Sequence, residues 1–351
     1  MSLSPFEHPF LSRLFGDAEI ASLFSADADI AAMIRFERAL ALAEADRGML
    51  TVDIAETIDT VLGVFVPDMA GLAKGTARDG VVVPALIRQM RAALGGAAAE
   101  KVHFGATSQD VIDTSLMLRL KAASDIIRAR LDAVLGDLDA LMKRDGDKPL
   151  MAHTRMQAAI EIKAADRIGA WRSPLERTRS RLTHFAVDGF ALQFGGAAGT
   201  LEHFGDDGPG LRAALAARLG LHERAQWHSQ RDVVAEFAGL MSLITGGLGK
   251  MGQDIALLAQ AGAEISLAGG GGSSAMPHKQ NPVAAELLVT LARFNATQVS
   301  TLHQSLVHEQ ERSGAAWMLE WMTLPPMVLA TATALRTARQ LLGDIRRIGR
   351  D

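Results

Sequence analysis

The sequence contains no cysteine and no tyrosine, and only 5% of its 351 residues are aromatic. Without cysteine the chain can form neither disulfides nor a thiolate metal site, so a reducing compartment is permitted and we predict a cytoplasmic protein. The formal net charge of -4 provides no basic excess for binding nucleic acid. With so few aromatic residues, alanine, leucine and methionine must fill the interior, as they do in packed helices.

Long apolar runs are also absent. No stretch reaches about 18 uninterrupted apolar residues, so no membrane span is expected. The first residues, MSLSPFEHPFLSRLF, contain prolines and charges instead of an apolar run, and we predict no signal peptide. The chain is nevertheless long enough for two or three domains with substantial buried cores.

What the sequence does contain is helical periodicity. From Val111 to Arg144, apolar residues recur mostly at every third or fourth position without a proline, which predicts a helix of roughly 50 Å. Strand-like alternation is nearly absent. Further helices are predicted over 20–50, 156–188 (with a kink or break at Pro174), 228–267, 282–311 and 315–346. The predicted fold class is therefore all-α, a long-helix bundle.

Glycines and prolines divide the chain into regions. Residues 52–100 are broken into short helical pieces at Pro67 and at several glycines, so residues 1–104 are predicted to form an N-terminal helical domain. Residues 105–346 are predicted to form the central bundle, and 347–351 a tail. The apolar stripes of the long helices look too broad for one subunit to bury, which predicts oligomerisation.

A glycine-rich segment, GGGGSSAMPHKQNPVAAE at 269–286, is the strongest local signal. Four consecutive glycines suggest a hinge, and two serines follow them. Lys279 and Asn281 then place a cation and an amide donor close by, and Pro282 can open the next helix. Such a set suits the capture of a carboxylate by a flexible lid, although composition alone is equally compatible with a surface linker.

A second polar segment, VHFGATSQDVIDT at 102–114, lies at the start of the long helix. The hydroxyls of Thr107 and Ser108 and nearby backbone N–H groups would form an anion site at the positive end of that helix. From the residues alone, simple helix capping is the favoured interpretation. His103, just upstream, is equally suited to contacting a ligand or to capping a helix.

The order of residues in these segments resembles that of the fumarase/aspartase superfamily. GSSAMPHKQNP at 272–282 meets every fixed position of the family's signature loop, GSSxMPxKxNP. The 102–114 segment resembles the family's first conserved region. Other matching segments are LQFGGAAGT at 192–200, HSQRDVVAEF at 228–237 and HEQERSGAAWMLEW at 308–321. The resemblance extends from about residue 20 to residue 325.

This resemblance implies roles for individual residues. Ser273, the first serine of the pair, corresponds to the family's catalytic base. The expected substrate contacts are Thr107, Ser108, Gln109, Lys279, Asn281, Arg312 and, upstream of the first region, His103. The resemblance also implies a homotetramer in which three subunits build each active site, and chemistry on a small polycarboxylate without a cofactor or a metal. The run HEQER at 308–312 lacks the second histidine of a zinc-binding HExxH motif.

One family position differs in this sequence. The lyases and hydratases carry a Thr-His pair in their second conserved region, where this chain has Thr154 followed by Arg155. His153 lies two positions too early to replace that histidine. We expect Arg155 to pair with Glu286 or to hold a substrate carboxylate. The C-terminal helical domain usual in the family is also not part of this sequence.

The missing histidine has a chemical meaning. In the family reaction, run as an addition, a nucleophile attacks a double bond conjugated to a carboxylate, and a base must deprotonate water or an amine. An ionised carboxylate of the same molecule needs no such base, and its addition gives a lactone. The matching segments look closest to the 3-carboxy-cis,cis-muconate cycloisomerases, which form such a lactone in aromatic catabolism. By that resemblance, Ser273 would deliver a proton to carbon.

Three other interpretations remain open. A related enzyme would accept a sulfonate in place of one carboxylate. A lyase of the adenylosuccinate or argininosuccinate type would release fumarate, and the absent Thr-His histidine argues against it. A catalytically inactive structural protein on the same scaffold would be expected to carry a damaged site, whereas Ser273, Lys279 and Asn281 are all present.

Overall fold

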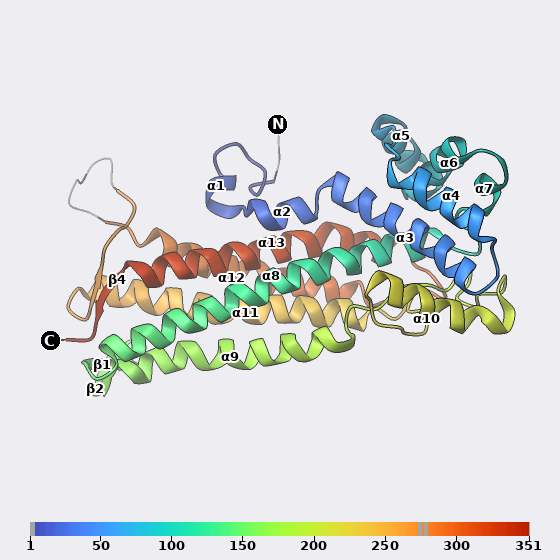
Figure 1. Cartoon of the computed structure of the whole chain (residues 1–351). Coiled ribbons are helices and arrows are strands. Elements are labelled where there is room, and N and C mark those ends of the chain that lie inside the picture. Colours follow the sequence, from blue (N-terminus) through green and yellow to red (C-terminus); the bar gives the residue numbers. More distant parts are fainter. Residues whose placement is uncertain (1–3, 273–275, 277–279, 351) are drawn as a thin grey trace.

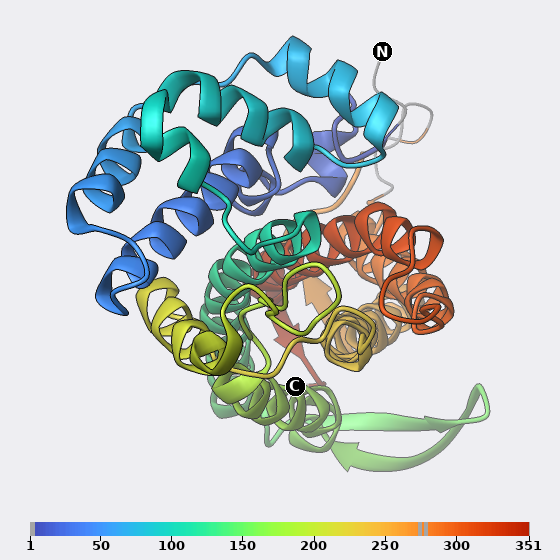
Figure 2. The same cartoon turned by 90° about the vertical axis from the view of Figure 1, so that its right-hand side faces the viewer.

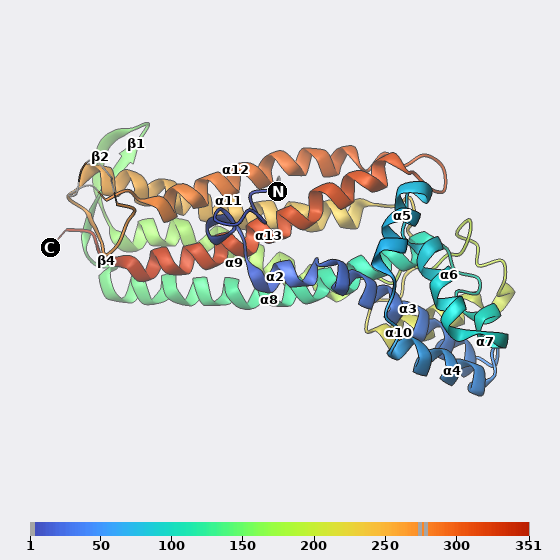
Figure 3. The same ribbon diagram turned by 90° about the horizontal axis from the view of Figure 1, so that it is seen from above.

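The computed structural model describes residues 4–272, 276 and 280–350, and the predicted site residues Ser273 and Lys279 lie outside the described residues. Five long helices run side by side along the molecule (Figures 1 and 3). They are α8 (Ser108–Asp145), α9 (Ala164–Asp188), α11 (Asp232–Ala261), α12 (Val283–Gln304) and α13 (Ala315–Asp344). The predicted all-α bundle is therefore confirmed.

Apolar residues at helical spacing explain this packing. Along α8, Ile127, Leu131 and Leu138 are completely buried, so one stripe of the helix faces the core. Small residues let the helices approach closely. A Cβ added at Gly252 of α11 would lie 2.6 Å from the carbonyl oxygen of Ala285 on α12, so no larger residue fits between the two helices there.

Two of the long helices continue through prolines. α9 runs past Pro174 without interruption, which excludes the break, one of the two outcomes predicted there. α13 likewise contains Pro325 and Pro326. Each proline removes one backbone donor from its helix. Trp171 and Leu175, on either side of Pro174, are completely buried, and this tertiary packing holds α9 in place.

A β-hairpin stands where the sequence predicts the start of a helix at residue 156. β1 (Pro149–Thr154) pairs antiparallel with β2 (Gln157–Lys163), and the hairpin extends away from the bundle (Figure 2). Arg155 and Met156, the two turn residues, have positive φ angles of 48° and 66°, as a two-residue hairpin turn requires. The helix prediction is wrong here because nearly all of β2 is exposed, so no helical face is buried.

A second small sheet lies near the end of the chain. β3 (Ile265–Leu267) pairs antiparallel with β4 (Ile345–Ile348), so the helices before these strands end a few residues earlier than predicted. α11 ends at Ala261 because Gly262 adopts a left-handed φ of 81° and caps it.

Shorter helices precede α8 or connect α9 to α11, and most of them cluster at one end of the bundle (Figures 1 and 3). They are α1 (Ser12–Phe15), α2 (Ala18–Leu23), α3 (Ala26–Asp46), α4 (Val52–Gly63), α5 (Met69–Asp79), α6 (Val83–Leu94), α7 (Gly96–Lys101) and α10 (Gly208–Leu219), the last preceded by the 3-10 turn η1 (Gly205–Asp207).

The helix predicted over 20–50 is divided, because the Ser25 hydroxyl accepts a hydrogen bond from the Ala28 N–H (3.1 Å) and caps α3. α3 packs directly on α8, and the domain boundary at residue 104 stays a prediction.

Among the described helices, α11 alone is long and apolar enough to cross a membrane, judged by length and composition only. Of the 18-residue apolar stretch of α11 that gives this result, 61% is buried inside the protein. A core helix passes the same test, so the finding is weak evidence for a membrane span.

Glu44 on α3 is a buried acid, and its Oε1 has no hydrogen-bond partner in the described structure. Burial and the nearby Glu37 carboxylate together raise the pKa of Glu44 to about 8, with Lys101 partly opposing the shift. Glu44 is therefore mainly protonated at neutral pH. Its stabilising contribution is complete below the ordinary pKa of about 4.5 and is lost as pH rises through about 8.

The substitution Glu44→Gln should remove this pH dependence. We expect the wild-type protein to lose on the order of 3 kcal/mol of unfolding free energy relative to E44Q between pH 5 and pH 9, since each pKa unit corresponds to about 1.4 kcal/mol. Urea unfolding followed by circular dichroism measures the difference. Glu56→Gln, at an exposed position on α4, is the matched control and should leave the pH profile unchanged. Parallel pH profiles for wild type and E44Q would show that Glu44 does not titrate in this range.

Candidate active site

α8 begins at the polar segment that was predicted to bind anions. Thr107 is its N-cap, Ser108 is its first residue, and the Asp110 carboxylate accepts a hydrogen bond from the Thr107 N–H (3.0 Å). Thr107 therefore does take part in capping. The positive end of a 38-residue helix lies at the same place, and it favours an anion beside the two hydroxyls. Capping and anion binding are thus compatible here.

The buried Asp110 carboxylate joins three segments of the chain. It accepts hydrogen bonds from the Gly195 and Gly196 N–H groups (2.9 and 3.0 Å) and lies 2.8 Å from His228 Nε2. Gly196 has a φ of 72°, and a Cβ there would lie 2.9 Å from the Gly105 carbonyl oxygen. Only glycine fits both conditions. The glycine-rich segment that contains these residues therefore packs against the start of α8.

The loop after α12 brings Arg312 back to the start of α8. Its Nε donates to Gln109 Oε1 (3.0 Å), and its Nη2 donates to the Ala197 carbonyl oxygen (3.1 Å). Within the described part of the chain, Nη1 has no hydrogen-bond partner. The structure thus brings Thr107, Ser108, Gln109 and Arg312, four of the predicted contacts, to one end of α8.

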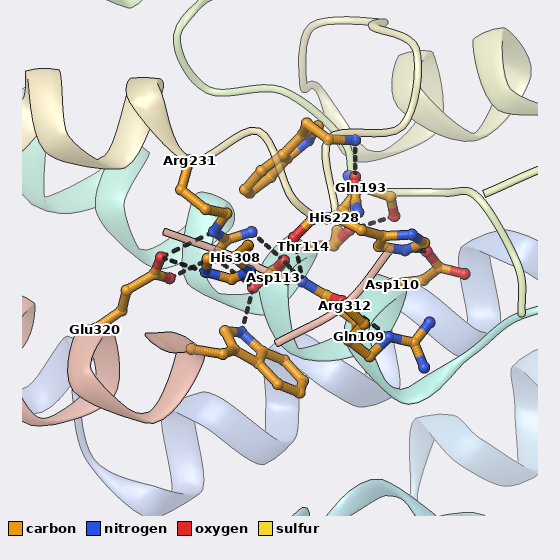
Figure 4. A network of polar contacts seen from close by, with 12 residues as sticks. Gln109, Asp110, Asp113, Thr114, Gln193, His228, Arg231, His308, Arg312 and Glu320 are labelled. Carbon is orange, nitrogen blue, oxygen red and sulfur yellow. Dashed lines mark hydrogen bonds and ion pairs between the residues drawn. The ribbon is translucent and has the colours of Figure 1, made fainter. Parts of the chain in front are cut away.

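A fully buried charge network lies behind this end of α8 (Figure 4). Arg231 donates from Nη1 and Nη2 to the two oxygens of Asp113 (2.6 and 3.1 Å). It also donates to both oxygens of Glu320, with Nε at 2.9 Å from Oε1. Trp317 Nε1 donates to Asp113 Oδ1 (2.9 Å), and His308 Nε2 lies 3.8 Å from Glu320 Oε1.

The charges in this network stabilise one another's ionised forms. Burial lowers the pKa of Arg231, but the two carboxylates outweigh burial and the net shift is upward. Burial raises the pKa of Glu320, and the Arg231 guanidinium outweighs it, so the net shift is downward. Arg231 is therefore a cation and Glu320 an anion at neutral pH.

The sequence alone does not assign Arg231, Asp113 or Glu320 to the site. Their segments matched the family, but no role was assigned to them. The sequence does contain one sign of them, since each is a charged residue at a position where the apolar spacing of the helices predicts the core. A charge at such a position is expected to be buried, but the pattern does not identify the residue that pairs with it.

His103 lies in the loop that leads into α8 and has a left-handed φ of 65°. Its Nδ1 is 2.7 Å from Glu37 Oε1 on α3. Burial lowers the pKa of His103, but the charge of Glu37 and the hydrogen bond to it outweigh burial and raise the pKa overall. When the ring is protonated it forms an ion pair with Glu37, so the two side chains together bring no net charge to the start of α8.

The start of α12 and the β1–β2 hairpin lie at the end of the bundle opposite the start of α8 (Figure 1). Asn281 comes two residues before α12, Arg155 lies in the hairpin turn, and Thr107 caps α8. Two backbone hydrogen bonds between Asn281 and Gly271 (2.9 and 2.8 Å) close the base of the glycine-rich loop. Arg155 is exposed at the hairpin tip, and the described structure contains no ion pair between it and Glu286. That expected pair is not formed within one subunit. Because α8 is roughly 57 Å long, one subunit cannot bring both groups of predicted contacts together.

The chain is a bundle of long helices in which the polar residues Thr107, Ser108, Gln109 and Arg312 gather at the start of α8. The lyase family matches residues 10–299, and the chain belongs to this family. This agrees with the superfamily that the sequence motifs resemble.

The more specific similarity is to cycloisomerases. The chain is 36% identical over 335 residues to the 3-carboxy-cis,cis-muconate cycloisomerase of Bradyrhizobium diazoefficiens, covering 93% of this chain and 74% of that protein. It is 38% identical over 338 residues to the enzyme of that name in Pseudomonas aeruginosa, covering 93% and 73%. The crystal structure of 3-carboxy-cis,cis-muconate lactonizing enzyme from Pseudomonas putida superposes with a TM-score of 0.89 at 34% identity, covering 96% and 77%.

Proposed function

We propose that this chain is a cycloisomerase that converts 3-carboxy-cis,cis-muconate, or a 3-sulfo analogue, into a muconolactone in aromatic catabolism. The observation that carries the proposal is the similarity to cycloisomerases along more than nine-tenths of the chain. The same similarity favours this function over that of a fumarate-releasing lyase of the adenylosuccinate or argininosuccinate type.

The geometry at the start of α8 supports a polycarboxylate substrate. Arg312 offers guanidinium hydrogens that no group in the described part of the chain accepts, and His103 lies in the adjoining loop. Thr107 and Ser108 add hydroxyls at the positive end of α8. A guanidinium, two hydroxyls and a helix N-terminus suit a substrate that carries several carboxylates, because each charge removed from water must be compensated.

The proposed reaction needs no external nucleophile. An ionised carboxylate of the substrate attacks the far carbon of a double bond, forming one C–O bond. The electron pair of that double bond moves to the carbon next to the second carboxylate, which becomes enolate-like. Ser273 then donates its hydroxyl proton to that carbon and recovers a proton from solvent. Lys279 and Asn281 stabilise the negative charge of the intermediate, and Arg312 binds a carboxylate that does not react. The ionised substrate takes up one proton from solvent as one carboxylate becomes an ester, so substrate and lactone are isomers when both are counted as free acids.

The predicted contacts at the two ends of the bundle support a shared active site. Within a homotetramer, the start of α8 from one subunit would meet the hairpin tip and the glycine-rich loop of others. The hairpin is suited to such a contact, because it extends from the bundle and leaves Met156 and Ile160 73% and 69% exposed. Arg155 would then bind a carboxylate in a neighbouring site. We further propose that the assembly is cytoplasmic, has no nucleic-acid or membrane partner, and uses no cofactor.

The test is to mix the purified protein with 3-carboxy-cis,cis-muconate and to follow the conjugated-diene absorbance. We expect the absorbance to fall as one double bond is consumed, with a lactone as the product by mass and NMR. The 3-sulfo analogue in a parallel assay compares the two substrates. Adenylosuccinate and argininosuccinate serve as controls, and neither should yield fumarate. Fumarate release with an unchanged diene signal would instead identify a lyase.

A further inference from the structure

We propose that Gln109 is a positioning residue, which sets the direction of the Arg312 guanidinium and so the affinity for a substrate carboxylate. The inference rests on the proposed function, in which Arg312 binds that carboxylate. Gln109 itself is completely buried, and its amide is bonded within the protein. It therefore acts on the substrate through Arg312.

The hydrogen bonds of Gln109 leave its amide only one orientation (Figure 4). Nε2 donates to Asp113 Oδ2 (3.2 Å) and to the His228 carbonyl oxygen (2.8 Å), which uses both amide hydrogens. Oε1 therefore faces the other way and accepts from Arg312 Nε (3.0 Å). In a flipped amide, the oxygen would face a carboxylate and a carbonyl, and the NH₂ group would face a guanidinium. Each of those contacts is repulsive.

The groups that hold Gln109 are themselves fixed. Asp113 accepts two hydrogen bonds from Arg231 and one from Trp317 Nε1, and its carboxylate is completely buried. Arg231 is anchored in turn by Glu320. The position of Gln109 Oε1 is therefore determined by a rigid interior and not by a mobile surface chain.

Arg312 needs such a support because it lies in a loop and is partly exposed. Gln109 takes its Nε hydrogen and the Ala197 carbonyl takes one Nη2 hydrogen. One Nη1 hydrogen and the second Nη2 hydrogen are then left as a fork that can donate to both oxygens of a carboxylate. Without the Nε contact, the long side chain would have to be ordered by the substrate itself, which weakens binding.

A double-mutant cycle on Gln109 and Arg312 tests this assignment through KM and kcat on 3-carboxy-cis,cis-muconate. Arg312→Ala should raise KM on the order of 100-fold, and Gln109→Met about tenfold, since hydrogen bonds to charged groups are being lost. In both variants kcat should change much less, because the carboxylate is bound equally in the ground state and the transition state. In the R312A background, Q109M should raise KM no further. An equal Q109M effect in both backgrounds would overturn the proposal.

Gln193→Met is the matched control for burying a methionine in place of a glutamine. Gln193 is also completely buried, but its Oε1 accepts from the Trp227 N–H (2.8 Å) and not from Arg312. Q193M should leave KM unchanged, although its melting temperature should fall by about as much as that of Q109M. If Q109M does not fold, Gln109→Asn replaces it, because this shorter amide cannot reach Arg312 while still bonded to Asp113.

A crystal structure of Q109M gives a readout that does not depend on turnover. A displaced Arg312 guanidinium supports the positioning role even if another substrate proves correct, and an unmoved guanidinium overturns it. A third outcome is that the guanidinium is displaced in Q109M while R312A has an unchanged KM. This would refute the role of Arg312 in substrate binding, and with it the link from Gln109 to affinity.

Discussion

Replacing Ser273 by alanine is expected to slow turnover by roughly 10²–10⁴-fold, the usual scale for the loss of a general acid or base. In the proposed reaction its hydroxyl donates the proton that ends on carbon. Solvent water would have to reach the same carbon without a fixed orientation, which is slow. KM should change little, because other residues bind the carboxylates. The initial rate of diene loss at saturating substrate measures the effect.

The control for this variant is Ser266→Ala, which removes an exposed hydroxyl on β3, outside the signature loop. It should turn over at the wild-type rate. Circular dichroism and the oligomeric mass should be the same for S266A, S273A and wild type. A near-wild-type kcat in a correctly assembled S273A protein would refute the role of Ser273 and leave the proton to another donor.

The largest effect on stability is expected for Arg231→Met. This change leaves the carboxylates of Asp113 and Glu320 buried, facing each other's charge, without the cation that bridges them. Removing one partner of a buried ion pair typically costs about 3–5 kcal/mol of unfolding free energy. Denaturant unfolding at a fixed protein concentration measures the loss, since subunit association contributes to apparent stability.

Two further variants separate the lost charge from the lost side chain. Arg177→Met, at an exposed position of α9, should cost less than about 1 kcal/mol. The triple variant R231M/D113N/E320Q removes all three charges and should recover much of the stability that R231M loses, because no unpaired charge stays buried. Equal losses in R231M and the triple variant would show that packing, and not charge, determines the effect.

Local sequence information was sufficient for the long helices and for the capping residue at the start of α8. The spacing of Ile127, Leu131 and Leu138 repeats every turn or two, so each residue adds to the same prediction. The polar residues Thr107 and Ser108 precede such a stripe, which is why helix capping at the start of α8 could be predicted, and Thr107 is indeed the N-cap. Both conclusions depend on neighbours within a few positions along the chain.

The hairpin could not be predicted in this way. Its turn requires positive φ at Arg155 and Met156, where glycine or asparagine would normally mark a tight turn. Neither residue is present, and the sequence QAAIEIK that follows contains residues that also suit a helix. The hairpin therefore depends on where α8 ends and α9 begins, and not on a local turn signal.

The sequence by itself determined a helical bundle and the motifs of a lyase-family active site, because periodic apolar residues and short ordered motifs are local features. Only the tertiary structure decided that Arg231 bridges Asp113, 118 positions away, and Glu320, 89 positions away. It also decided that Arg312 meets Gln109 across 203 positions. Such pairs form when separate helices pack together, and the energy of a buried charge depends on the partner that packing supplies, which no local pattern encodes.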